Sequence, residues 1–196
     1  MNRRLLLVRS TKVFVLIGLA FAAYPFLSTL LPDAGVDATR QQQWRHEVDL
    51  SQLRAGELLL IDDWPGGPVA VYRRTAHELD GLTRIDDQLH DPGSQYSQQP
   101  AQLHTATRSY LSDYFVFIPA DTDRGCLPRP LPAAKQPKED IAWHGGFTES
   151  CNGSLYDTAG RVYRGYRSAR QQNLRVPAYQ PIGKTHIRLT GPAPNR

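Results

Sequence analysis

The sequence predicts an all-β head that follows one N-terminal helix, and three observations support this fold class. Fifteen Pro and fifteen Gly among 196 residues, with a single Met, indicate many turns and short strands rather than a helix bundle. Short apolar runs separated by turn residues recur through the chain after residue 56. The one long apolar run, residues 13–32, precedes them all. The length suits one globular domain with an appendage.

The positive charge of the chain lies at its N-terminus. Of the 23 Lys and Arg, four fall within residues 1–12, which contain no acid. The remaining 19 basic side chains are balanced by 19 acidic ones. Residues 13–196 therefore carry no formal surplus, and nothing predicts a basic groove for nucleic acid.

Residues 13–32, VFVLIGLAFAAYPFLSTLLP, contain no charged side chain. Twenty helical residues span about 30 Å, the thickness of the hydrocarbon core of a bilayer. A cleaved signal peptide is the alternative, because Ala20-Phe21-Ala22 resembles a cleavage site. The apolar run continues well beyond Ala22, which favours an uncleaved anchor. The basic residues 1–12 then predict a cytoplasmic N-terminus and an exported head; the paired arginines also weakly match a twin-arginine signal.

The exported part divides into a neck and a head. Residues 33–46 are polar and lack apolar periodicity, so we expect a neck there and a head over 47–196. The runs ELLLID (57–62) and VAVYRR (69–74) flank a Pro/Gly turn and predict a hairpin, with Thr75 and Glu78 as a capping box. Further strands are expected at YFVFI (114–118), RVYRG (161–165) and HIRLT (186–190), and a long surface excursion at 86–112.

Two cysteines, Cys126 and Cys151, lie in the head. In an oxidising compartment a disulfide is the default for such a pair. A loop of about 25 residues would contribute roughly 3.5 kcal/mol by constraining the unfolded chain. A reactive or metal-binding thiol pair is the alternative, but two cysteines and scattered histidines do not complete a four-ligand site.

Four segments of the head follow the basic N-terminus and the single anchor: EVDLSQLRAGELLLIDDW, GGPVAVYRRTAHEL, DPGSQYSQQP and GGF…GSLYDTAGRVYRG…NLRVPAY. In this order they resemble the Rieske iron–sulfur subunit of the bacterial cytochrome bc1 complex (ubiquinol–cytochrome c reductase). The resemblance implies antiparallel sheets and a small loop-rich subdomain, here about residues 119–166. It also implies a bacterial inner-membrane location with the head in the periplasm.

In that family two loops, Cys-Thr-His-Leu-Gly-Cys and Cys-Pro-Cys-His-Gly-Ser, hold a [2Fe–2S] cluster through two cysteines and two histidines. Their other two cysteines form a disulfide, which the resemblance assigns here to Cys126 and Cys151. The matching segments are residues 121–126 and 149–154. The four ligand positions are occupied by Asp121, Asp123, Glu149 and Asn152. The scaffold positions that match the family are Gly125, Gly153, Ser154 and Tyr156. Carboxylates and an amide do not replace soft thiolates, so no [2Fe–2S] cofactor is expected.

Three further departures from the family concern docking of the tip. Arg124 stands where the family has a leucine that packs into the quinol-oxidation pocket, and burying a charge in an apolar cleft is costly. Residues 165–173, GYRSARQQN, replace a Gly-Pro-Ala-Pro loop, and the neck is bulkier than the family's Ala-rich one. Together they argue against a swinging, quinol-oxidising head.

The sequence therefore predicts a membrane-anchored, non-catalytic accessory subunit of bc1 or of a bc1–oxidase supercomplex, with no small-molecule substrate. One alternative is a hard-cation site made by the acidic tip, since Asp121, Asp123 and Glu149 offer oxygen ligands. Another is retained electron transfer, for which His144 is the only nearby imidazole. No nucleophile-elbow, zincin or P-loop spacing supports a hydrolase or transferase.

Overall fold

The computed structural model describes residues 3–28 and 45–191. Contacts within the chain divide it into two units, residues 1–40 and 41–196. The first contains helix α1, Arg3–Ser28, which continues through Pro25. No helix among the described residues is both long enough and apolar enough to cross a bilayer. The last part of the expected anchor, residues 29–32, and most of the expected neck lie outside the described residues.

The second unit contains three antiparallel sheets of three short strands each. The first sheet has the order β1-β9-β8: His46–Asp49, His186–Leu189 and Tyr179–Ile182. The second has the order β2-β3-β4: Leu58–Ile61, Val69–Arg73 and Tyr114–Phe117. The third has the order β5-β6-β7: Arg129–Leu131, Gly146–Thr148 and Leu155–Asp157. The all-β class predicted for the head is confirmed.

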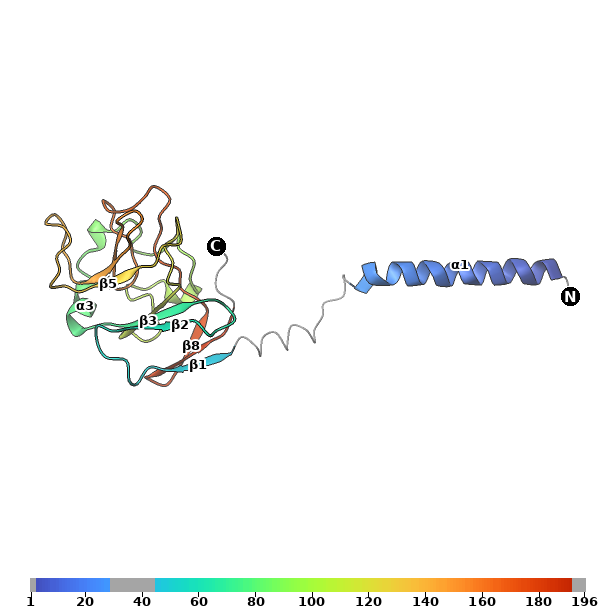
Figure 1. Ribbon diagram of the computed structural model, residues 1–196, viewed down its shortest axis with the longest axis horizontal. Coiled ribbons are helices and arrows are strands. Elements are labelled where there is room, and N and C mark those ends of the chain that lie inside the picture. Colours follow the sequence, from blue (N-terminus) through green and yellow to red (C-terminus); the bar gives the residue numbers. More distant parts are fainter. Residues whose placement is uncertain (1–2, 29–44, 192–196) are drawn as a thin grey trace. The chain divides into compact units, whose positions relative to one another are not determined.

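The sheet β2-β3-β4 lies between the other two (Figure 1), and its strands carry most of the core. All four residues of β4 are buried. Phe115 and Phe117 stack at 4.9 Å between ring centroids, and Phe147 of β6 packs against both. One continuous core therefore joins the third sheet, whose loops carry the site, to the rest of the head.

The local predictions around β2 and β3 are confirmed. These strands pair as a hairpin with Leu58 opposite Tyr72, and β4 and β9 occur within the predicted runs. Thr75 caps helix α3, Ala76–Gly81, and makes the reciprocal capping-box contacts with Glu78. Each of these features depends on a few neighbouring residues, which is why the sequence alone indicates them.

One expectation is wrong, and another holds only in part. Residues 161–165 form no strand and make only isolated bridges, because the N–H groups of Arg161 and Val162 donate to side chains, those of Asp157 and Asn173. Residues 86–112 lie largely at the surface, as expected, but the segment also places a fully buried Arg108 in the interior of the head.

Arg108 shows how this polar segment is fixed to the rest of the head. Its guanidinium donates to the backbone carbonyls of Ala159 and Leu174 at 2.8 and 2.7 Å. The guanidinium carbon, Cζ, lies 5.9 Å from the ring centroid of Phe115. Burial lowers the pKa of Arg108 to about 9. The short helices η1, Asp86–Gln88, and η2, Ala101–Leu103, lie in the same segment.

Candidate functional site: the loop tip

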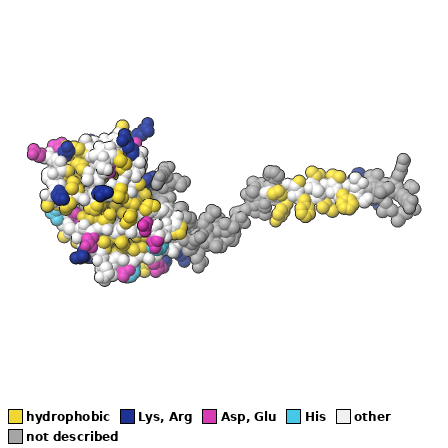
Figure 2. Space-filling model, viewed as in Figure 1, with side chains coloured by type: hydrophobic (Ala, Val, Ile, Leu, Met, Phe, Trp, Pro, Cys, Tyr) yellow, Lys and Arg dark blue, Asp and Glu magenta, His cyan; other side chains and the backbone are white. Residues whose placement is uncertain are grey.

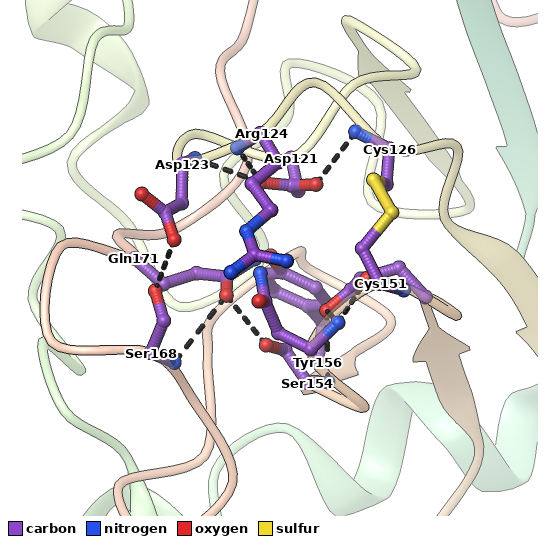
Figure 3. Close-up of a disulfide and its surroundings, with 11 residues drawn as sticks. Asp121, Asp123, Arg124, Cys126, Cys151, Ser154, Tyr156, Ser168 and Gln171 are labelled. Carbon is purple, nitrogen blue, oxygen red and sulfur yellow. Dashed lines mark hydrogen bonds between the residues drawn. A yellow bond between two sulfur atoms is a disulfide. The ribbon is translucent and has the colours of Figure 1, made fainter.

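Two loops continue directly from the strands of the third sheet. The first, residues 121–127, precedes β5, and the second, residues 149–154, connects β6 to β7. The Cys126–Cys151 disulfide joins them, with 6.3 Å between the two Cα atoms. The pairing predicted from sequence is confirmed, and Figure 3 shows the arrangement around it. Among the described residues, no cysteine is free.

Asp121 organises the first loop from inside. The side chain is 1% exposed. Its Oδ1 accepts hydrogen bonds from the backbone N–H groups of Asp123 and Arg124 at 2.7 and 2.8 Å. Its Oδ2 accepts from the N–H of Cys126 at 2.6 Å, and its own N–H donates to the Cys126 carbonyl. A short carboxylate that binds successive N–H groups is a common device for closing a tight loop.

Glu149 does the same in the second loop. It is 2% exposed. Its carboxylate accepts from the N–H groups of Cys151 at 2.6 Å, Asn152 at 3.0 Å and Ser154 at 3.0 Å. The Glu149 N–H donates to the Ser154 carbonyl and closes the loop at its base. Two of the four predicted ligand positions, Asp121 and Glu149, thus hold buried carboxylates whose oxygens already bind the backbone of their own loops.

The two predicted scaffold glycines are required by backbone conformation. Gly125 has φ = 76° and Gly153 has φ = 69°, values in the left-handed region that side chains disfavour. No atom lies within 4 Å of where a Cβ would stand at either position. Backbone conformation, and not crowding, therefore explains glycine in each loop.

A third loop, residues 165–173, closes over the tip, and sequence reasoning did not assign its contacts. Gln171 is fully buried. Its side-chain oxygen accepts from the Ser154 hydroxyl, and its side-chain N–H₂ donates to the Tyr156 hydroxyl oxygen. Burial and then the nearby Asp121 charge raise the pKa of Tyr156, so the phenol stays protonated. Gln171 therefore forms hydrogen bonds with the hydroxyls of both Ser154 and Tyr156, two of the predicted scaffold residues.

The third loop is also bound to the first at its edge. The Ser168 hydroxyl donates to Asp123 Oδ2 at 2.7 Å (Figure 3). The Thr122 hydroxyl accepts from the Gln172 N–H at 2.7 Å and donates to the Gln172 carbonyl at 3.2 Å. Nothing in the sequence signals these pairs, because their members lie about fifty residues apart.

The four predicted ligand positions do not converge on one point. Asp121 and Glu149 face their own loops, Asp123 binds Ser168, and Asn152 contributes its N–H to Glu149. The Asn152 side-chain nitrogen is buried and has no hydrogen-bond partner among the described residues. A hard-cation site built from these residues gains no support from this geometry.

A different group of potential metal ligands lies within 4.8 Å among the described residues: Cys126, Glu149 and Cys151. Its two sulfurs are bonded to each other, so it offers no thiolate. His144 is not part of it: the ring lies beside His77 of α3, 5.3 Å between centroids. Burial lowers the pKa of His144.

The chain is similar in sequence to iron–sulfur subunits of ubiquinol–cytochrome c reductases. The chain is 34% identical to the ubiquinol–cytochrome c reductase iron–sulfur subunit of Allochromatium vinosum, over 94% of this chain and 86% of the relative. It is 31% identical to the subunit of the same name from Bradyrhizobium diazoefficiens, over 96% and 94%. A chain of a hyperthermophilic respiratory Complex III aligns over 92% of this chain and 98% of its own length, with 16% identity and a TM-score of 0.43. No protein-family model matches the sequence.

These relatives correct one expectation. The prediction of no [2Fe–2S] cofactor is contradicted, because the relatives are named iron–sulfur subunits. The donors at this tip do not fit the two thiolates and two imidazoles of a Rieske centre, since they are carboxylates and an amide beside a disulfide. The donor set of this chain and the name of its relatives therefore disagree, and the function proposed below does not depend on the cofactor.

Proposed function

The chain belongs to the family of ubiquinol–cytochrome c reductase iron–sulfur subunits, and from this premise we propose that it is a structural or accessory subunit of such a respiratory complex. The complex is of the bc1 type, alone or joined to an oxidase. The observation that carries the proposal is the inward orientation of Asp121 and Glu149, which use their carboxylates to hold the tip loops in shape.

The contacts of the tip favour a scaffolding task. Each carboxylate accepts hydrogen bonds from three backbone N–H groups, and the disulfide joins the two loops. Gln171 then binds the third loop to Ser154 and Tyr156. A tip whose buried carboxylates and amide are used to hold its own loops presents a preorganised surface, which suits a subunit that contributes shape and contacts to an assembly.

The membrane topology is part of the proposal. Residues 13–32 would anchor the chain in the inner membrane, with residues 1–12 in the cytoplasm and the head in the periplasm. Extraction of membranes at alkaline pH should leave the chain in the pellet, and protease added to spheroplasts should digest the head. Release of the full chain into the soluble fraction would contradict the anchor.

The test of the accessory role is deletion of the chain in its native host, followed by two measurements on the respiratory complex. We expect less assembled complex, with unchanged quinol–cytochrome c turnover for each complex that remains. Affinity purification of the tagged chain from gently solubilised membranes should recover respiratory subunits in fixed proportion. Isolation as a lone monomer would contradict the role. So would a stoichiometric Rieske-type EPR signal together with loss of turnover on deletion.

A further inference from the structure

The outward side of the three tip loops forms one surface, which we call the tip surface. Its exposed members come from all three loops: Arg124, Gly125, Leu127, Cys151, Gly153 and Arg170. Leu127 is 45% exposed, a large fraction for a leucine. Figure 2 shows Lys and Arg side chains projecting from the end of the head that carries these loops.

Charges of opposite sign are sorted between the inside and the outside of the tip. Asp121 and Glu149 are buried, and their charges are offset by backbone N–H groups. The third acid, Asp123, is half-buried and accepts the Ser168 hydroxyl. The exposed ionised side chains of the tip are consequently arginines, although its three acids and three arginines sum to no formal charge.

Arg124 and Arg170 have no carboxylate partner among residues 45–191, the part of the head that the structure describes. The ion pairs among the described residues all lie elsewhere, such as Arg84 with Asp80 and Arg188 with Glu47. In Figure 3 the Arg124 side chain crosses the tip without a dashed contact from its guanidinium. Arg167 differs, because its guanidinium donates to carbonyls of its own loop, including that of Gln171. Arg124 and Arg170 are thus available to a partner.

We propose that the tip surface docks onto an acidic protein surface, in which carboxylates pair with Arg124 and Arg170 and an apolar side chain contacts Leu127. The guanidinium fork matches a carboxylate in a two-bond geometry. Arginine is enriched in protein–protein interfaces, and an exposed leucine adds apolar area to such a contact. An apolar cleft would instead leave the charge of Arg124 unpaired and desolvated. The proposal rests on the proposed function, since it takes the partner to be a subunit of the same complex.

The first experiment uses the full-length tagged chain with Arg124→Lys, which keeps the positive charge and adds a reactive amine. Membranes are treated with a water-soluble carbodiimide, which couples a lysine amine to a carboxylate in direct contact. We expect an amide crosslink between position 124 and an Asp or Glu of a co-purifying subunit, lost when coupling is done in 0.5 M NaCl. The native Lys135 and Lys184 are exposed outside the tip loops and serve as internal controls, since neither should form this crosslink.

The second experiment reverses the charges. The double variant Arg124→Glu with Arg170→Glu should bind the partner subunit more weakly. We expect the dissociation constant to rise at least about tenfold, because like charges then face each other. The matched control, Lys135→Glu with Lys184→Glu, changes the net charge equally and should bind as the parent does. Equal melting temperatures of parent and variants show that the fold is intact.

The outcomes separate the two proposals. Two results would overturn the acidic docking site but would not contradict the accessory role. In the first, respiratory subunits co-purify with the chain while no crosslink forms at position 124. In the second, they co-purify while the charge reversal leaves their affinity unchanged. A crosslink to an acidic protein outside the respiratory chain would support the docking site and overturn that role. Charge-dependent binding to phosphatidylglycerol vesicles with no protein crosslink would show a lipid partner and overturn the protein one.

Discussion

The turn at Asp157 and the two tip loops each bury a carboxylate, and they neutralise it in two different ways. Asp157, at the end of β7, accepts backbone N–H groups and also pairs with the buried Arg161, with Nε 2.7 Å from Oδ2. Asp121 and Glu149 at the tip accept only backbone N–H groups. Both arrangements satisfy the carboxylate. They differ in how far their effect extends along the chain.

The cation makes the difference. Arg161 also donates to Asp86 and to the Leu82 carbonyl, more than seventy residues away, so the Asp157 turn ties distant segments together. A carboxylate bound to N–H groups orders its own loop and no other. Connections between the tip loops are therefore left to the disulfide and to Gln171.

The comparison predicts the largest loss of stability at Arg161. Replacement by Met leaves Asp157 buried without its cation, which costs about 3–5 kcal/mol of unfolding free energy for such a broken pair. Chemical denaturation of the full chain in detergent measures it. Arg84→Met, which removes the exposed pair with Asp80, should change stability by less than about 0.5 kcal/mol. Similar losses of stability in the two variants would contradict the larger role given to the buried pair.

The disulfide comes next. Cys126→Ser with Cys151→Ser removes the covalent link across 25 residues and should lower stability by about 2–4 kcal/mol, because the unfolded chain gains freedom. The same loss should follow reduction of the parent. A melting temperature that does not respond to reductant would show that the hydrogen bonds alone hold the tip.

Replacement of one tip carboxylate should have a smaller effect. In Glu149→Gln the amide keeps one acceptor oxygen but turns an N–H₂ toward donors, at a cost of about 1–3 kcal/mol. Amide hydrogen exchange at Cys151, Asn152 and Ser154 should accelerate, while exchange in β3 should not. Glu139→Gln, at an exposed position, is the control. Uniform acceleration through the head would mean that the effect of Glu149 is not local.

The smallest effect is a pH dependence away from the tip. Burial, and then the charge of His77, hold the pKa of His144 below its ordinary value. The unfolded chain therefore binds the proton more readily, so stability is retained above about pH 6.5 and declines as the pH falls below it. The melting temperature between pH 7.5 and 5 should fall less steeply in His144→Gln. An unchanged slope would assign the decline to other groups, such as His90, whose pKa is also lowered by burial.

Local patterns account for the parts of the head that were predicted correctly. The hairpin of β2 and β3, the capping box of Thr75 and strand β4 each depend on neighbouring residues. The error at residues 161–165 has its cause outside the segment, because Asn173, eleven residues further along the chain, supplies the acceptor that binds the Val162 N–H. Similarly, Arg108 sits in a polar segment and is buried by carbonyls fifty or more residues away.

The sequence by itself determined the all-β class of the head, the pairing of Cys126 with Cys151 and the resemblance to the iron–sulfur subunit family. Those properties follow from residue types and their order. Only the tertiary structure decided where Asp121 and Glu149 point and what Gln171 binds. The physical reason is that a carboxylate or amide has several possible partners of similar strength, and the folded backbone decides which of them lies within hydrogen-bond reach.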